Sequence, residues 1–466
     1  MNKIVQFIFL LILCCIPVCV LIAMGTYCLG YPDLYSFKEI IWTICGIFIS
    51  IFLFKKLHVV IEHLSIKRIV IIGIGILNFF MFVVLFSFNT QPCSDYEVIW
   101  DIANKMAIGE FNINDYPTSS YIYVYNWQLG ISALESIFIR WFGPHFSILK
   151  IVNLIIINLT ALTCFVISKR ITSISASKFS LLLFCTYYPI IITVGQFTNQ
   201  HLAALLILSI LYLLVQKKWV YYIIAGIMTA ILNVIRPMGI LILLSVICML
   251  VYYLIRKTDI KKNMLRTIAF FVSYFLILSA FDKLFIELEY ADSAISQPKI
   301  GYFKFDKGLT GYNAPNLIPF DGNVEAFNEW EKEKLINLIT EKPKEIVIYV
   351  VKKMNLYLGL FDYKFENTYN HDMSIWAQYP IKAFYSFGWG QYIFLIVFAI
   401  IGYNKWRKNH DVDIFQVFYI GNTLVYLFIE AFSAYRYESY PILIMFAGYG
   451  LYHYNKSSKN FIHRSN

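Results

Sequence analysis

Long apolar stretches recur along almost the entire chain and leave little polar sequence between them. Of the 466 residues, 59% are apolar and only 15% are charged, and the mean hydropathy is +0.62. A soluble domain carries about 25% charged residues. So much apolar side chain needs a lipid bilayer as its solvent, and the sequence therefore predicts an all-α polytopic membrane protein.

Twelve stretches are long enough, or nearly so, to cross a bilayer, since a spanning helix needs about 20 apolar residues. The expected spans are residues 4–29, 40–54, 69–88, 146–168, 179–194, 197–215, 219–235, 238–255, 264–281, 383–401, 414–432 and 440–454. Two polar regions between them are too long for simple connections. We therefore divide the chain into amino-terminal spans (1–88), a first outer loop (89–145), central spans (146–281), a second outer loop or lid (282–380) and carboxyl-terminal spans with a cytoplasmic tail (381–466).

Clustered basic residues predict the orientation of the chain. The net charge of +10 is compatible with a nucleic-acid partner, but membrane proteins collect basic residues in their cytoplasmic loops, and this explains the charge without nucleic acid. With the amino terminus inside, the short cytoplasmic connections carry the pairs Lys55-Lys56, Lys67-Arg68, Lys169-Arg170, Lys217-Lys218 and Lys261-Lys262. We expect a multi-pass protein of the cell membrane with both termini in the cytoplasm and both long loops outside.

One apolar stretch, residues 121–141, allows two interpretations. It is apolar enough to span, but it contains the polar side chains Asn126, Gln128, Glu135 and Arg140. A span here would place the next basic pair outside and invert every later loop. We expect an amphipathic or re-entrant helix along the outer membrane surface, and a spanning helix is the alternative.

The second outer loop begins with turn-rich sequence and continues with two predicted helices. Asp321 and Asn323 are suitable caps for a helix over residues 324–340, and a second helix is expected after Pro343, over residues 345–360. No internal repeat of the transporter type is visible, which disfavours a secondary transporter.

The most informative polar segment follows the third expected span directly. Ser94 and Glu97 have the spacing of a capping box, which predicts a helix that ends near Gly109. At 100° per residue, Asp95 shares one side of this helix with the apolar residues that follow it. If that side meets the membrane, Asp95 points toward the membrane surface, where a carboxylate is costly and indicates a task. The alternative is an acidic residue that interacts with the helix dipole.

Two arginines lie at the outer ends of expected spans. Arg236 ends the seventh span, and Arg436 precedes the last span between Tyr435 and Tyr437. A guanidinium at headgroup depth can bind a phosphate with two hydrogen bonds. The alternatives are ordinary interfacial snorkelling and, for Arg436, a pair with Glu430.

His201, which follows Asn199 at the outer end of the sixth span, is a candidate ligand contact, although a hydrogen-bonded packing histidine is the favoured interpretation. No combination of histidines and acidic residues has metal-ligand spacing, so a divalent metal is conceivable but unsupported, and no other cofactor is indicated. The sequence has no phosphate-binding glycine loop and no nucleophile elbow. A soluble nucleotide-linked substrate is therefore disfavoured.

Four segments together resemble a known family. They are Ser94-Asp95-Tyr96 after an early span, Trp141-Phe142-Gly143 at the end of the surface helix, residues 233–239 (NVIRPMG) and residues 435–441 (YRYESYP). In order and placement they are similar to the GT-C glycosyltransferases, particularly the family-39 group that includes protein O-mannosyltransferases and the aminoarabinose transferases of lipid A. The resemblance covers roughly residues 89–454.

This resemblance implies a GT-C-like fold and an integral-membrane glycosyltransferase. The donor would be a polyprenyl-phosphate-linked sugar, the acceptor a hydroxyl of a glycan, lipid or protein, and transfer would occur at the outer face with inversion. Asp95 maps onto the family's first-loop acid, as the catalytic base, while Arg236 and Arg436 fall where basic residues can bind the lipid phosphate. Further candidate substrate contacts are Tyr96, Asn199, His201, Tyr435 and Tyr437.

Two other classes of function remain open at this point. A flippase or polymerase for lipid-linked glycans also needs outer arginines for pyrophosphate, but not an acid at the start of the first outer loop. A structural or assembly membrane protein would need neither Asp95 nor the two arginines. The sequence does not indicate which sugar or which acceptor is used.

Overall fold

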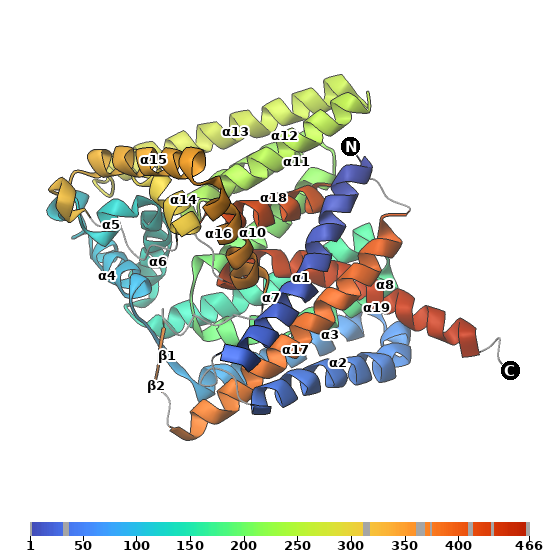
Figure 1. Ribbon diagram of the computed structural model, residues 1–466. Coiled ribbons are helices and arrows are strands. Elements are labelled where there is room, and N and C mark those ends of the chain that lie inside the picture. Colours follow the sequence, from blue (N-terminus) through green and yellow to red (C-terminus); the bar gives the residue numbers. More distant parts are fainter. Residues whose placement is uncertain are drawn as a thin grey trace.

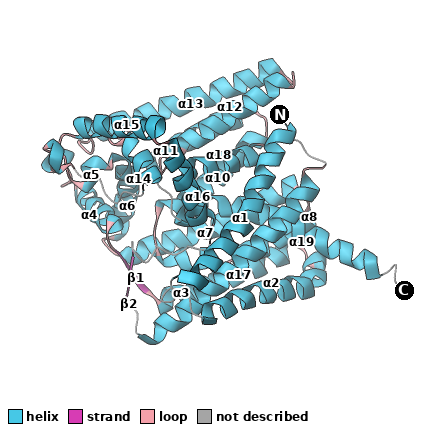
Figure 2. Cartoon of the chain, in the orientation of Figure 1, coloured by secondary structure: helices cyan, strands magenta, loops and turns pink. Residues whose placement is uncertain are grey.

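The computed structural model describes residues 2–30, 37–310, 317–359, 369–372, 375–408, 413–429 and 433–462. The described secondary structure is almost entirely helical (Figure 2). Within these ranges the strands form one two-stranded antiparallel ladder. The chain is therefore an all-α membrane protein apart from this short ladder, which the sequence did not predict.

Helices occur at all twelve expected stretches. The bundle is built from α1 (Asn2–Gly30), α2 (Phe37–His63), α3 (Ile66–Ser87), α7 (Phe146–Ile171), α8 (Ile174–Thr186), α9 (Tyr188–Ile191), η3 (Ile192–Gly195), α10 (Asn199–Val215), α11 (Trp219–Ile235), α12 (Gly239–Ile255), α13 (Ile260–Glu287), α17 (Ile375–Trp406), α18 (Ile414–Phe428), η6 (Ser433–Ser439) and α19 (Tyr440–Ile462).

Among the described residues, six helices are long and apolar enough to cross a membrane, and a seventh span results if α8 and the α9–η3 segment count as one bent unit. The bend in that unit is 53°. Helices α10, α11, α12 and α18 are apolar but shorter. The protein is thus a multi-pass membrane protein, while the number of twelve spans stays a prediction.

The elements of the two outer regions gather at one end of the bundle. Helices α4, α5, α6, α14 and α15 lie together there, on the left of Figure 1, and the amino-terminal end of α1 and the carboxyl-terminal end of α19 lie away from them. The first region contains β1 (Asn89–Pro92), α4 (Asp95–Ile108), η1 (Ile113–Asp115), α5 (Tyr121–Val124), η2 (Asn126–Gln128) and α6 (Leu129–Phe142).

Two predictions for the first region need correction. Residues 121–141 do not form one surface helix, because the chain breaks into α5, η2 and α6, and α6 packs on α4 and α11. Helix α4 has the predicted extent and ends at Gly109 in the left-handed conformation, but Ser94 makes no side-chain cap hydrogen bond. The capping box is therefore wrong: Ser94 itself has a φ of 53°, which is not a capping conformation.

The second outer region folds onto the same end of the bundle. After α13 come α14 (Gly301–Thr310), η4 (Ile318–Phe320), α15 (Val324–Glu341), α16 (Pro343–Leu358) and β2 (Tyr369–Asp372). The two predicted helices are confirmed, and the Asn323 side chain caps α15 by accepting a hydrogen bond from the Ala326 N–H. Strand β2 pairs with β1 in antiparallel register and so joins the two regions, which are far apart in the sequence.

Small residues allow the long helices to approach closely. Helix α17 packs along both α19 and α2. A methyl group on Gly402 would overlap the Phe446 carbonyl of α19, and one on Gly450 would overlap the Phe398 carbonyl of α17. Such contacts are typical of helices that pack in a membrane, where van der Waals contact replaces the hydrophobic driving force.

Candidate functional site

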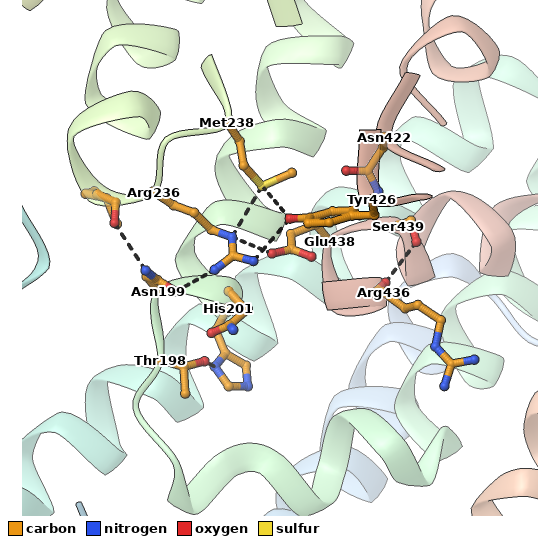
Figure 3. A network of polar contacts seen from close by, with 12 residues as sticks. Thr198, Asn199, His201, Arg236, Met238, Asn422, Tyr426, Arg436, Glu438 and Ser439 are labelled. Atoms are coloured by element: carbon orange, nitrogen blue, oxygen red, sulfur yellow. Dashed lines mark hydrogen bonds and ion pairs between the residues drawn. The ribbon is translucent and has the colours of Figure 1, made fainter. Parts of the chain in front are cut away.

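Arg236 occupies the centre of a buried polar cluster inside the bundle (Figure 3). Its Nε lies 2.7 Å from Oε1 of Glu438 in η6. Its Nη1 donates to Oδ1 of Asn199 at 2.9 Å, and its Nη2 donates to the hydroxyl of Tyr426 at 3.2 Å. The cluster therefore joins the end of α11, the start of α10, the last turn of α18 and η6.

The local sequence explains why Arg236 reaches this position. Helix α11 stops before Pro237, because a residue that precedes proline avoids helical geometry, and Arg236 has an extended φ of −151°. The Asn233 side chain then accepts a hydrogen bond from the Gly239 N–H at 3.1 Å and fixes the turn into α12. The guanidinium also lies over the ring of Tyr435, 5.1 Å from its centroid.

Burial makes the Arg236–Glu438 pair important for folding. The side chain of Arg236 is 10% exposed and that of Glu438 is fully buried. An isolated charge in such a place is very unfavourable, whereas a pair with additional hydrogen bonds is tolerated. The two residues are thus positioned by each other, and the location of Arg236 at headgroup depth stays a prediction.

Arg436 is also buried rather than exposed at the membrane surface. Its Nη1 donates to the carbonyl of Gly359 at 2.7 Å, and its guanidinium lies 4.5 Å from the ring centroid of Tyr392. Figure 3 shows its side chain pointing away from Arg236. Glu430, the alternative partner, lies outside the described residues. Because Gly359 follows α16, the second outer region extends to this part of the site.

Tyrosine rings connect the second outer region to Arg236. The rings of Tyr357 and Tyr426 lie 5.3 Å apart, and those of Tyr426 and Tyr435 lie 5.2 Å apart. The Tyr357 hydroxyl accepts a hydrogen bond from Asn422 at 3.2 Å. A row of aromatic rings therefore leads from α16 to the guanidinium of Arg236.

Tyr96 connects the first outer region to the same cluster. Its hydroxyl donates to Oε1 of Gln200 at 3.2 Å, one residue after the Asn199 that holds Arg236. Burial raises the pKa of Tyr96, and the charges of Arg236, Asp95 and Glu135 also act on its hydroxyl, that of Arg236 in the opposite sense. The first turn of α4 thus lies within electrostatic reach of the arginine.

Asp95 itself is exposed at the first turn of α4. The apolar residues on its side of the helix, Ile99, Ile102 and Met106, are buried in the protein. Ile99 packs with residues of α6, α7 and α11. The condition under which Asp95 would point toward the membrane is therefore not met, because protein covers this side of α4, and Asp95 is exposed beside Tyr96.

His201 has a structural environment. Its Nδ1 is 3.0 Å from the Thr198 hydroxyl, and its Nε2 is 2.9 Å from the Thr193 hydroxyl. Its ring contacts that of Tyr437, with centroids 4.4 Å apart. Both ring nitrogens are occupied, so the histidine holds the turn from η3 into α10, and this arrangement fits the packing interpretation.

Two buried acids were missed by sequence reasoning. Glu438 had no role of its own within the 435–441 motif, and Glu135 was noted only as a polar residue in the apolar stretch 121–141. Glu135 is 2% exposed, its Oε2 has no hydrogen-bond partner, and burial holds the pKa of its carboxyl well above the usual range. A rule that treats every acidic residue in apolar surroundings as costly would have found both.

No metal centre is present in the part of the chain that the structure describes: no group of three or more His, Cys, Asp or Glu side chains there is arranged to hold an ion.

No family model matches the chain, and no curated protein matches it either. Among solved structures it is similar to the crystal structure of ArnT from Cupriavidus metallidurans bound to undecaprenyl phosphate. The identity is 11%, over 84% of this chain and 78% of that chain, and the TM-score is 0.37. A likeness at this level carries no conclusion about function, so the function has to be argued from the residues of the site.

Proposed function

We propose that the protein is a membrane glycosyltransferase that moves a sugar from a polyprenyl-phosphate-linked donor to an acceptor hydroxyl. The observation that carries the proposal is that the charge of Arg236 acts on the hydroxyl of Tyr96, the direct neighbour of Asp95, through the adjacent residues Asn199 and Gln200, which bind Arg236 and Tyr96. An anion-binding group and a carboxylate are the two groups that such a transfer requires. The resemblance of the four sequence segments to GT-C enzymes supports the same assignment.

The donor phosphate is assigned to Arg236, and Arg436 is assigned as a second cation of the site. A guanidinium has five N–H donors, and the contacts of Arg236 with Glu438, Asn199 and Tyr426 leave two of them for phosphate oxygens. In the transfer, the bond between the anomeric carbon and the phosphate oxygen breaks, and the phosphate leaves with the electron pair. The arginines stabilise the negative charge that it gains.

Asp95 is assigned as the base. The acceptor oxygen attacks the anomeric carbon on the face opposite the phosphate, its proton passes to the Asp95 carboxylate, and the product is inverted. The exposed position of Asp95 at the start of α4 is suited to an acceptor that arrives from outside the bundle. Tyr96, Asn199, Tyr435 and Tyr437 then act as contacts or as positioning groups.

The second outer region is assigned as a lid over this reaction. Its helix α16 brings Tyr357 and the Gly359 carbonyl to the arginines. A groove of about 510 Å³ with a purely apolar lining lies between α14, α15 and α16 and reaches Phe428, two residues beyond Tyr426. Such a groove offers apolar surface to isoprenoid units, and closure by the lid would exclude water, which otherwise hydrolyses the donor.

The basic connections support a position of the lid and Asp95 on the outer face of the cell membrane, with both termini in the cytoplasm. Cysteine labelling of residue 95 and of the α7–α8 connection from either side of sealed vesicles tests this orientation. Labelling of both positions from the same side would contradict it.

Asp95→Asn is the direct test of the activity. Purified protein is supplied with polyprenyl-monophosphate-linked sugars and a membrane extract as acceptor source, and release of polyprenyl phosphate is measured. We expect a loss of roughly 10²–10⁴-fold in turnover, the usual contribution of a general base. Asp101→Asn, on an exposed position of the same helix, is the matched control and should keep full activity.

Full turnover in the Asp95→Asn variant would exclude Asp95 as the catalytic base and contradict the proposed mechanism. Movement of an intact lipid-linked glycan across vesicles, without release of polyprenyl phosphate, would instead assign the protein to the flippase class.

A further inference from the structure

A basic cleft lies at the opposite end of α11 from Arg236, where α10 passes into α11 and where α13 begins. It encloses about 810 Å³, and four of its nine lining residues are basic: Lys217, Lys218, Lys262 and Arg266. None of the lining residues is acidic, and the lining surface is mostly apolar. The cleft therefore combines positive charge with an apolar wall.

Three of the four basic side chains, those of Lys217, Lys218 and Arg266, interact with neutral groups. The ammonium of Lys218 lies 5.6 Å from the ring centroid of Tyr221, and that of Lys217 lies 5.4 Å from the ring of Tyr253. Nη1 of Arg266 donates to Oδ1 of Asn263 at 3.0 Å. Within the described residues, none of the four cations is paired with a carboxylate, so their charge is available to an anion.

The apolar side chains of the cleft point out of the protein. Trp219 is 64% exposed and Leu265 is 58% exposed. Because α13 is one of the helices long and apolar enough to span a membrane, we expect exposed apolar side chains near its start to lie beside lipid. Basic and aromatic side chains at the end of a spanning helix lie at the depth of phospholipid headgroups.

The start of α11 adds to the positive potential. Lys218 at its N-cap position makes no side-chain hydrogen bond to the first turn. The first N–H groups of a helix carry a partial positive charge and attract anions. Trp219, Val220 and Tyr221 of this first turn all line the cleft.

We propose that this cleft binds the phosphate headgroup of an anionic phospholipid from the surrounding bilayer. The cations and the start of α11 hold the phosphate, and the acyl chains lie along Trp219 and Leu265. The site is distinct from the Arg236 cluster, and the proposal does not depend on the transferase activity. A free phosphate ion has the same charge but makes no use of the apolar wall.

The test is a titration of the full chain in detergent micelles with phosphatidylglycerol, phosphatidylcholine or inorganic phosphate, followed by thermal unfolding. Phosphatidylglycerol should raise the midpoint most. In Lys218→Gln/Lys262→Gln, in which both altered side chains are exposed, the apparent affinity should fall about fivefold for each charge lost. Lys169→Gln/Arg170→Gln removes an exposed basic pair at the end of α7 and should leave the affinity unchanged.

Three outcomes would overturn the proposal. Equal affinity for phosphatidylglycerol in the Lys218/Lys262 variant would exclude the cleft. Equal stabilisation by phosphatidylcholine, which has no net charge, would show that the net negative charge of the headgroup does not contribute to binding. The same shift with inorganic phosphate alone would show that the cleft takes a free anion and not a lipid.

Discussion

Two buried charge clusters differ in how their charges balance. Inside the bundle, Arg236 and Glu438 form a one-to-one pair with a separation of 2.7 Å. In the second outer region, Nζ of Lys334 lies 2.7 Å from Asp306 and 3.9 Å from Glu331, so two carboxylates depend on one ammonium. Both of these carboxylate side chains are almost completely inaccessible to solvent.

The two clusters differ in the net charge that their ionised groups carry. The ionised Arg236–Glu438 pair is neutral as a whole, although burial, against the charge of Arg236, raises the pKa of the Glu438 carboxyl to about 7. Two carboxylates beside one cation carry an excess negative charge, which a bound proton can remove. Burial, together with the charge of Asp306 and against that of Lys334, raises the pKa of Glu331 to about 7. Both carboxyls can therefore titrate near neutral pH, but only the second cluster carries an excess negative charge when all of its groups are ionised.

The largest effect is expected from breaking the balanced pair. Glu438→Met leaves the Arg236 guanidinium buried without its counter-ion, and Arg236→Met does the same to the carboxylate. Either change should lower the free energy of unfolding by about 3–5 kcal/mol, the usual cost of removing one partner of a buried pair. Thermal or denaturant unfolding of the purified protein in detergent measures this loss.

The double variant Arg236→Met/Glu438→Met is the control for this prediction. It removes both charges, so its stability should lie close to that of the wild type. Additive losses in the double variant would mean that the two residues contribute independently, and the ion pair would not be the reason for their burial.

A smaller effect, one that depends on pH, is expected from the unbalanced cluster. Because the pKa of Glu331 is raised in the folded state to about 7, its contribution to stability is complete below the unfolded value of 4.5 and is lost as the pH rises through 7. The midpoint of thermal unfolding should therefore fall between pH 5 and 8. Glu331→Gln should flatten this dependence, and an unchanged slope in that variant would assign the titration to another group.

Local sequence signals predicted single elements well. The helix over residues 324–340 and its cap at Asn323 were found because capping and periodicity act within a few residues. The same logic located the end of α4 at Gly109. It failed at residues 121–141, where apolar composition suggested one helix, because packing against α4 and α11 decides where the chain breaks.

The site depends on contacts that no local signal encodes. Arg236 and Glu438 are 202 positions apart in the sequence, and no local sequence signal indicates that they form a pair. The burial of both arginines was not predicted for the same reason, since the partners that make burial tolerable come from α10, η6 and the residue after α16. The residue types at a site can therefore be guessed from sequence, whereas their partners cannot.

The smallest effect is expected from an ion pair that is exposed to solvent and has one cation for one anion. Lys283 and Glu287 form an i,i+4 pair at 3.5 Å near the end of α13, with side chains that are 77% and 61% exposed. Water and salt screen such a pair, so Lys283→Gln should change the free energy of unfolding by no more than about 0.5 kcal/mol. Unfolding at low and at high salt measures this change. A loss comparable to that of Glu438→Met would show that burial does not determine the importance of a charge in this protein, and the contrast between the two clusters would lose its physical basis.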